Sequence, residues 1–491
     1  MLRSARALCP FLFPLAALGA GCTSTTRPDF VVHVVSPSGA NPFLDPDFCA
    51  NGTLNVDVWQ PGGEVLTQHA TITGGTIGDL TVSIPSYGAL TRIHARADCS
   101  GGSVTGVLGA TPQFVPIGYP GVDVVVGAPG TCVELSAPTL APARVAPALV
   151  ALGANVLVFG GRSSSGSPQQ RIQVVDPVQL TSTAAGVGGA FDPLTVGIGV
   201  GGAVVLDATR VAFVSDTLDG IYETSQSATG DRLSTLAVHT GAGDASAIVD
   251  LGGSGMAVVG GFDGTAAVDT ITWVPSNGNA PTTGHLVHPR RRPTAVLFAG
   301  GRLLVVGGQA AGAPLFEIVT PMGSSSATFG PTDARYAPLV ATDRTRMHAF
   351  VALGTADPDG TGAILDTTLE VGACTTDGCT AQPGETWPGM LRRGFAVVAH
   401  DVGTSGYETL VFGGVDAAGM PTQAADRIEI AQDGMASVTT FGHLAVARDR
   451  PGAVAIASGV VLVAGGADAA GNALGGIEIC FPTELAPINA D

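Results

Sequence analysis

One short phrase recurs along the chain and decides the fold. It reads NVLVFGG at 155–161, GMAVVGG at 255–261, RLLVVGG at 302–308, TLVFGG at 409–414 and VVLVAGG at 460–466. Two weaker copies fill the gaps, RVAFVSD at 210–216 and HAFVALG at 348–354. These seven copies recur at intervals of about 45 to 60 residues, which is the spacing of four-stranded propeller blades.

The order of segments within each unit agrees with a four-stranded blade. An uninterrupted apolar run precedes the phrase, as in APALVAL from 146, PTAVLFA from 293, GFAVVA from 394 and GAVAIA from 452. Two consecutive runs of this kind predict two strands that are covered on both faces. After the glycine pair come a polar loop and an alternating strand, as at 171–177, 269–275, 426–431 and 476–482. Alternation predicts a more exposed strand, further from the axis of the ring.

Composition also favours an all-β protein. The 491 residues include 70 glycines and 33 prolines, and only 5% are aromatic, which is typical of many short strands and tight turns. The formal net charge is -18, and the basic residues are all arginine, so a polyanion such as DNA would be repelled. The apolar run at 452–467 is too short for a membrane-spanning helix and is better explained by two buried strands.

The repeated units resemble kelch repeats, in which a glycine pair follows the second strand and an arginine often opens the first. The resemblance implies a seven-bladed propeller, with six blades as the alternative. The sequence departs from the family in lacking most of its usual tyrosine and tryptophan pair. The arginine positions are matched by Arg144, Arg292, Arg335, Arg393 and Arg450.

On this fold the last unit ends at 482 with only three strands, so its fourth must come from elsewhere. The segment 132–138, just before the first unit, fits as that outer strand and would place Cys132 beside Cys480. A disulfide there would close the ring, Cys374 and Cys379 would close a hairpin, and Cys49 and Cys99 would remain for the amino-terminal region. Six cysteines allow many other connectivities, so this choice rests on the resemblance.

The amino terminus predicts export and an anchor. Residues 1–21 have the basic, apolar and small-residue regions of a signal peptide and resemble a bacterial lipoprotein signal that ends at Cys22, the residue to be lipidated. Gly19 occupies the position where that pattern prefers leucine, so plain secretion is the alternative. Thr23 after the cysteine implies the outer membrane. The lipid would be the protein's one contact with a membrane.

The expected domains follow in order. After the signal peptide come a lipidated cysteine and linker (22–29), a small β-sandwich (30–130), the propeller (131–482) and a tail (483–491). Alternating stretches such as FVVHVVSP, DLTVSIPS and VDVVVG predict that the sandwich is of immunoglobulin-like type.

The fold resemblance also raises the question of a metal site. Galactose oxidase and its relatives hold copper on a kelch-like propeller with two tyrosines, two histidines and a cysteine. Here the propeller tyrosines are Tyr222, Tyr336 and Tyr407, and the family's ligand motifs have no match, so we expect no copper. Spacing makes His285 and His288 a weak chelating pair, and we expect both in a loop between blades. Asp357 and Asp359, in DPDGTG, are a weak calcium candidate that lacks a completing glutamate. We expect no bound cofactor.

The arginines are the remaining candidate for a ligand site. If Arg144, Arg292, Arg335, Arg393 and Arg450 lie at one end of the channel, they would form a basic ring, to which Arg290, Arg291 and Arg392 add charge. The alternative is that such arginines join neighbouring blades through backbone carbonyls. We therefore expect a non-catalytic, exported surface protein that uses propeller loops to bind a protein or glycan. The competing hypothesis is a propeller enzyme of oxidase or glycan-active type.

Overall fold

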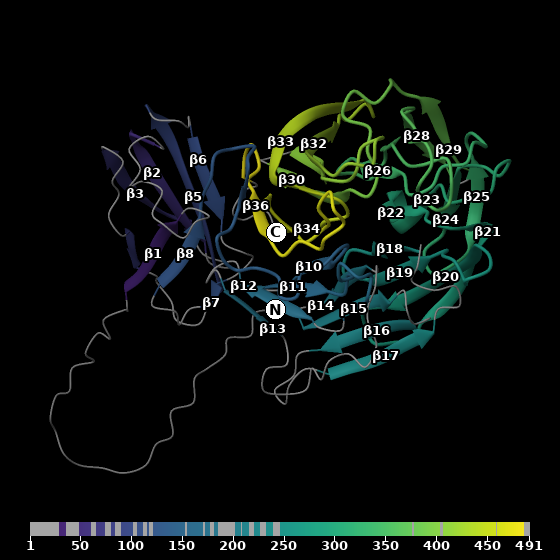
Figure 1. Cartoon of the computed structure of the whole chain (residues 1–491), viewed down its shortest axis with the longest axis horizontal. Coiled ribbons are helices and arrows are strands. Elements are labelled where there is room, and N and C mark those ends of the chain that lie inside the picture. Colours follow the sequence, from purple (N-terminus) through teal and green to yellow (C-terminus); the bar gives the residue numbers. More distant parts are fainter. Residues whose placement is uncertain are drawn as a thin grey trace, which may run out of the picture.

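The structure, a computed structural model, consists of many small antiparallel sheets and describes most of the chain (Figure 1). The described residues are 29–35, 49–59, 65–73, 80–83, 90–101, 106–110, 115–116, 121–152, 155–169, 172–176, 181–184, 202–207, 209–215, 220–225, 232–238, 246–375, 378–402, 406–457 and 459–485. Residues 1–21 and Cys22 lie outside this set. Within it, no helix is long and apolar enough to cross a membrane.

The amino-terminal region is a sandwich of two sheets. One has the order β4 (Leu80–Ser83), β1 (Asp29–Val35) and β8 (Gly121–Val125), with β1 and β8 parallel. The other has the order β3 (Leu66–Thr73), β2 (Asn51–Trp59), β5 (Leu90–Ser100) and β6 (Gly106–Ala110), and β7 (Val115–Pro116) also pairs with β5. Alternate residues of both sheets, including Val32, Val56 and Ile93, share one buried core. Cys49 and Cys99 are bonded there, as predicted.

The rest of the described chain forms seven four-stranded sheets, numbered here in chain order. Sheet 1 consists of β10 (Ala148–Leu152), β11 (Asn155–Phe159), β12 (Gln173–Asp176) and β13 (Thr181–Ala184), sheet 2 of β14 (Ala203–Asp207), β15 (Arg210–Ser215), β16 (Gly220–Ser225) and β17 (Arg232–Val238), and sheet 3 of β18 (Ala247–Asp250), β19 (Gly255–Val259), β20 (Val268–Pro275) and β21 (Thr282–Arg290).

The other four sheets repeat this order. Sheet 4 consists of β22 (Thr294–Phe298), β23 (Arg302–Val306), β24 (Phe316–Val319) and β25 (Ser325–Phe329), sheet 5 of β26 (Leu339–Thr342), β27 (Ala349–Ala352), β28 (Leu369–Thr375) and β29 (Gly378–Pro383), sheet 6 of β30 (Ala396–Val402), β31 (Gly406–Phe412), β32 (Thr422–Ile430) and β33 (Ala436–Arg448), and sheet 7 of β34 (Gly452–Ala457), β35 (Val460–Ala464), β36 (Ile477–Cys480) and β9 (Cys132–Glu134). A 3-10 turn, η2 (Ala299–Gly301), joins β22 to β23.

The sheets form a ring because each one packs face to face on the next (Figure 1). Every pair of neighbours shares an apolar cluster: sheets 1 and 2, 2 and 3, 3 and 4, 4 and 5, 5 and 6, 6 and 7, and 7 and 1. The repeated phrase supplies the second strand of each sheet, and β19 and β35 are buried along their whole length. Two buried faces explain why these strands read as uninterrupted apolar runs.

The ring closes as predicted. Strand β9 pairs antiparallel with β36, with Cys132 directly opposite Cys480, and the two cysteines are disulfide-bonded. The observed strand is shorter than the predicted segment 132–138. In sheet 5, Cys379 is also disulfide-bonded. Strands β28 and β29 are paired up to their connection, where Thr375 lies opposite Gly378. The side chain of Cys374 lies outside the described set, so the Cys374–Cys379 pair stays a prediction.

The sandwich lies beside the ring at this seam (Figure 1). Ala110 and Val125 of the sandwich belong to the same apolar cluster as Phe481, which joins sheets 7 and 1. The backbone N–H of Gly130 also donates to the carbonyl of Phe481 at 3.0 Å. The two parts of the chain are therefore packed together where the ring is closed.

Candidate functional site

The glycine pairs mark one end of the ring, which we call the glycine end. It comprises the pairs 160–161, 260–261, 307–308, 413–414 and 465–466 and the segments that open the next first strands. A Cβ on Gly260, Gly413 or Gly465 would lie 2.6 Å from the carbonyl oxygen of the arginine that opens the following sheet. The second glycine donates its N–H to that same oxygen, as Gly414 does to Arg448 at 2.7 Å. The pair therefore lets neighbouring sheets approach and bond.

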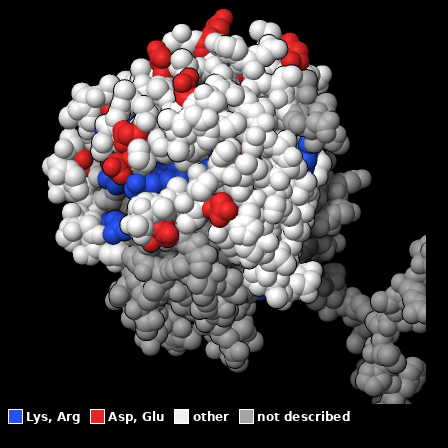
Figure 2. Space-filling model, turned by 90° about the vertical axis from the view of Figure 1, so that its right-hand side faces the viewer, with Lys and Arg blue, Asp and Glu red and all other residues white. Residues whose placement is uncertain are grey.

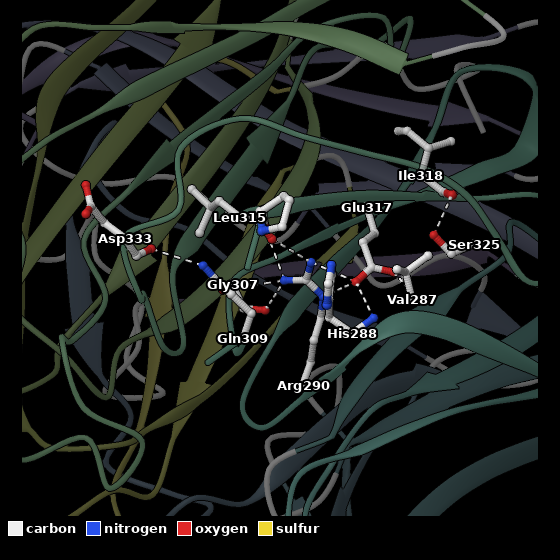
Figure 3. Close-up of polar contacts among 11 residues, drawn as sticks. Val287, His288, Arg290, Gly307, Gln309, Leu315, Glu317, Ile318, Ser325 and Asp333 are labelled. Carbon is white, nitrogen blue, oxygen red and sulfur yellow. Dashed lines mark hydrogen bonds and ion pairs between the residues drawn. The ribbon is translucent and has the colours of Figure 1, made fainter. Parts of the chain in front are cut away.

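The opening arginines are buried in the ring, as Arg290 shows (Figure 3). Its guanidinium donates to Glu317 Oε1 at 2.9 Å and to the carbonyls of Gly307 at 2.7 Å and Leu315 at 3.0 Å. Burial lowers the pKa of Arg290, while the charge of Glu317 and its hydrogen bond raise it. This side chain joins the end of β21, in sheet 3, to sheet 4 and is not presented to a ligand.

Four other arginines take the same position, and their contacts are similar. Arg144 donates to Val158 O and Gly160 O, Arg335 to Thr367 O, Arg392 to Val411 O, and Arg448 to Gly465 O and Gly476 O. Burial lowers the pKa of Arg335 to about 10. Arg144 and Arg335, two members of the predicted ligand ring, therefore bond to backbone carbonyls as the alternative expected, but within the sheet that each one opens and not between neighbouring sheets.

The carboxylates that face these arginines also reach the preceding sheet. Glu317 accepts the N–H groups of Val287 at 2.9 Å and His288 at 3.2 Å, both on β21 (Figure 3). Glu478 in sheet 7 does the same with Ala445 and Val446 on β33. Sequence reasoning missed these residues. The signal was an acidic residue in an otherwise apolar third strand, as in FEIV and IEIC.

Two residues after each buried arginine stands a residue in the left-handed region. These residues are Ala146 (φ 53°), Arg292 (φ 53°), Ala337 (φ 47°), Gly394 (φ 67°) and Arg450 (φ 48°). Their backbones bond from sheet to sheet around the mouth of the channel: Ala146 N donates to Arg450 O at 2.9 Å, Ala337 N to Arg292 O at 2.8 Å, and Arg450 N to Gly394 O at 2.8 Å. The unusual φ is thus explained by bonds made in both directions around the ring.

The predicted arginine ring therefore contains three kinds of residue. Arg144 and Arg335 are buried, Arg292 and Arg450 belong to the backbone ring, and Arg393 lies between the two positions. The aligned set of buried arginines is instead Arg144, Arg290, Arg335, Arg392 and Arg448. Spacing alone did not reveal this, because consecutive arginines at 290–292 and 392–393 leave the register ambiguous.

Two partly buried arginines of the glycine end, Arg291 and Arg292, contact loops of neighbouring sheets. Arg291 lies over the ring of Phe262, 4.1 Å from its centroid, and its Nη2 is 3.1 Å from Asp359 Oδ1. Arg292 donates to the Asp359 carbonyl at 2.9 Å. Tyr336 is buried nearby; burial raises its pKa, and the charge of Arg291 lowers it. Residues of sheets 3, 4 and 5 thus form one cluster, the Arg291 cluster (Phe262, Arg291, Arg292, Tyr336 and Asp359).

The calcium candidates lie in a loop that recurs in other sheets. Asp357 Oδ1 accepts the N–H groups of Asp359 at 2.9 Å and Thr361 at 3.2 Å. Asp416 and Asp468 cap the corresponding loops of sheets 6 and 7 in the same way. The carboxylate of Asp357 therefore stabilises its own turn. Asp359 is the ion-pair partner of Arg291.

The other metal hypotheses concern histidines and tyrosines. His285 and His288 lie on strand β21, not in a loop as expected, and His285 Nδ1 is 3.5 Å from Asp269. Tyr336 lies at the glycine end, whereas Tyr407 lies at the turn between β30 and β31, at the opposite end of the ring. These two tyrosines do not fit one copper site. The described part of the chain contains no group of three His, Cys, Asp or Glu residues that could hold a metal ion.

Surface charges are mixed on the side of the molecule that carries β21, β25 and β29. Figure 2 shows arginine atoms gathered in one row, with acidic side chains on both sides of it and mostly uncharged residues elsewhere. Adjacent opposite charges also occur at the glycine end, in the ion pair between Arg291 and Asp359. A partner that contacts this surface would therefore meet local pairs of opposite charges and not an extended electrostatic field of one sign.

No protein-family model and no curated protein matches the chain. Solved structures do match it. YjhT is 12% identical with a TM-score of 0.41, over 56% of this chain and 93% of YjhT. A structure described as a novel fungal alcohol oxidase of the AA5 family, in complex with copper, is 14% identical with a TM-score of 0.52, over 72% of this chain and 76% of the oxidase. At this identity the likeness concerns the fold alone, and it shows that the chain has a galactose oxidase-like β-propeller fold.

Proposed function

We propose that this protein is an exported, non-catalytic recognition protein built on a seven-bladed, kelch-like propeller. In this proposal each four-stranded sheet is one blade, and the preceding sandwich is an immunoglobulin-like domain. The loops of the glycine end bind a protein or a glycan. A ring of packed sheets suits this role because it holds loops from several sheets in fixed positions. The role requires no cofactor.

The observation that carries the proposal is the Arg291 cluster. Arg291 keeps 20% of its side chain exposed, stacks on Phe262 and pairs with Asp359, which is itself 68% exposed. Its Nε is buried without a hydrogen-bond partner among the described residues. Arginine and aromatic side chains supply much of the binding energy at recognition surfaces. A partly buried arginine on an aromatic ring, held by three sheets, is such an anchor.

The disulfides support export, because disulfides persist in oxidising compartments. We further propose that Cys22 carries a lipid that holds the protein at the outer membrane. Cys22→Ala should release the protein from membranes after cell fractionation. Cys9→Ala in the same leader is the matched control and should leave it there. Continued sedimentation of the Cys22 variant with membranes would contradict the anchor.

Glycan-array binding of the full chain tests recognition. We expect the wild type to bind selected glycans and Arg291→Gln to lose this binding. The variant lacks the guanidinium group that pairs with Asp359 and lies over the Phe262 ring. Arg96→Gln, at an exposed arginine of the sandwich, should bind like the wild type. Because the partner could be a protein, a pull-down from envelope extracts with the same variants is the second arm. Equal retention by all three proteins in both arms would contradict a site at Arg291.

The competing function is a propeller enzyme of oxidase or glycan-active type, which the fold likeness to an alcohol oxidase favours. Assays for hydrogen peroxide with primary alcohols after copper loading, and for cleaved glycans, separate the two. If the protein turns over an alcohol or a glycan and Arg291→Gln removes that activity, the enzymatic function replaces the recognition proposal. Binding without product supports it.

A further inference from the structure

A buried histidine faces a buried glutamate at the end of sheet 6 that lies opposite to the glycine end. His400 on β30 and Glu408 on β31 are directly paired in the strand ladder. Nε2 of His400 is 3.2 Å from Oε1 of Glu408, and the two side chains are only 5% and 1% exposed. The other ring nitrogen, Nδ1, is 3.0 Å from the carbonyl oxygen of Asp401. Both nitrogens of this imidazole therefore face oxygen atoms.

The two contacts together require a proton between the side chains. A carbonyl oxygen can only accept a hydrogen bond, so Nδ1 of His400 carries a hydrogen and donates it to Asp401. In a neutral imidazole the other nitrogen then presents a lone pair, which would repel the Glu408 carboxylate. The pair is therefore held either as imidazolium and carboxylate or as imidazole and carboxylic acid. Both forms contain one more proton than the repelling form.

The charged groups of sheet 6 do not replace this proton. Nε of Arg427, on β32, is 3.8 Å from Oε2 of Glu408. The same guanidinium also lies 3.5 Å from Glu429 and donates to the hydroxyl of Thr483 at 3.1 Å. Among the described residues, neither carboxylate oxygen of Glu408 accepts a hydrogen bond. The buried carboxylate thus depends on the histidine for its direct partner.

The neighbouring sheets enclose the imidazole without offering it another acid. A Cβ on Gly459, in the turn from β34 to β35 of sheet 7, would lie 3.0 Å from Cε1 of His400. Pro482, which follows β36, lies against the same glycine. On the side of sheet 5, the Asp401 carboxylate is paired with Arg344 at 3.2 Å. The imidazole therefore cannot turn away from the glutamate without moving sheet 7.

The segment that follows β36 connects this contact to the sandwich, which lies beside this part of the ring (Figure 1). The carbonyls of Phe481 and Pro482 accept the N–H of Gly130 at 3.0 Å and 3.3 Å. Cys132 and Cys480 belong to the apolar cluster between sheets 6 and 7. A displacement of Pro482 would therefore change the packing at the seam where the ring is closed.

We propose that the His400–Glu408 pair is a pH switch that controls how tightly sheet 7 and the sandwich pack on sheet 6. With its proton, the pair forms a buried, charge-assisted or neutral hydrogen-bonding contact. Without it, a buried carboxylate faces a lone pair, which is strongly unfavourable. The contact is thus present in mildly acidic solution and is lost as the pH rises, as for a histidine that gains an acidic partner on folding. The switch does not depend on recognition at the glycine end.

Hydrogen exchange of the full chain, followed by mass spectrometry at about pH 6 and about pH 9, tests the switch. After correction for the intrinsic effect of pH, residues 459–485 of the wild type should exchange at least about threefold faster at the higher pH. Residues 302–319 of sheet 4 are the internal reference and should not change. His94 in the sandwich does not interfere, because burial lowers its pKa to about 4.

Two variants test whether the response comes from the pair. His400→Gln keeps an amide N–H that can donate to Glu408 at either pH, so residues 459–485 should exchange equally at both. Glu408→Gln, whose amide can donate to a neutral imidazole, should behave in the same way. His285→Gln is the matched control: His285 is 62% exposed on β21, 3.5 Å from Asp269, and the variant should keep the wild-type response.

Nitrogen-15 NMR of the His400 ring, assigned by comparison with His400→Gln, tests the proton directly. We expect a protonated Nδ1 at about pH 6, because this nitrogen donates to the Asp401 carbonyl. A ring whose Nδ1 carries no proton would overturn the proposal. Equal exchange of the wild type at the two pH values, or a wild-type response in both His400→Gln and Glu408→Gln, would also do so.

Discussion

At the scale of single residues, the buried charges of the ring are arranged so that one carboxylate serves two sheets. Glu317 and Arg290 are both fully buried, and Glu317 also holds two N–H groups of the preceding sheet. A buried ion pair adds little over well-packed apolar residues, but removing one partner leaves an uncompensated charge. Each pair is therefore more important for holding neighbouring sheets in register than for net stability.

Glu317→Gln should lower the free energy of unfolding by about 3 kcal/mol, because Arg290 would keep its buried charge without a counter-ion. Chemical denaturation followed by fluorescence measures the effect. Glu429→Gln is the matched control: its carboxylate is 51% exposed, 3.5 Å from Arg427, and the loss should be below about 1 kcal/mol. If both variants lost the same free energy of unfolding, burial of the carboxylate would not determine the cost of removing its charge.

At the scale of elements, a glycine pair follows the second strand of five of the seven sheets, where the chain meets the segment that opens the next sheet. Gly413 is left-handed, and a Cβ there would lie 2.6 Å from the Arg448 carbonyl oxygen. Gly419, in the following loop, is also left-handed but has nothing within 4 Å of its Cβ position. The two positions separate the effect of backbone conformation from that of close approach.

Gly419→Ala should lower the free energy of unfolding by about 1 kcal/mol through backbone strain alone. Gly413→Ala should cost clearly more, because the methyl group would also push sheets 6 and 7 apart and weaken the bond from Gly414 N to Arg448 O. Thermal unfolding of the two variants side by side measures the difference. If Gly413→Ala were as stable as Gly419→Ala, close approach would not be the reason for the first glycine.

At the scale of the whole molecule, the ring is closed by a strand from its own amino-terminal side. Cys132 and Cys480 are 348 residues apart in sequence, so the disulfide constrains a very long loop in the unfolded chain. The adjacent sandwich contributes Ala110 and Val125 to the apolar cluster at the same seam. Closure thus depends on pairing, packing and a covalent bond at one place.

Replacing Cys132 and Cys480 together by serine should lower the free energy of unfolding of the ring by about 2–5 kcal/mol. Calorimetry measures this, with the Cys49 and Cys99 double variant as control, which should mainly affect the sandwich. Peptide mapping of the wild type should recover a Cys132–Cys480 peptide. Free thiols at both positions would contradict the closure.

The sequence by itself determined the repeat, the all-β class and the strand order within each unit, because period and apolar runs follow directly from local burial. The two confirmed disulfide pairs were predicted only through the resemblance to kelch repeats. Only the tertiary structure decided which arginines are buried, because Arg290 and Arg292 differ by a backbone φ and by contacts with residues far along the chain. The same holds for Glu317, whose partners lie on two sheets. Such contacts depend on how the sheets pack around the ring, and no local pattern records that packing.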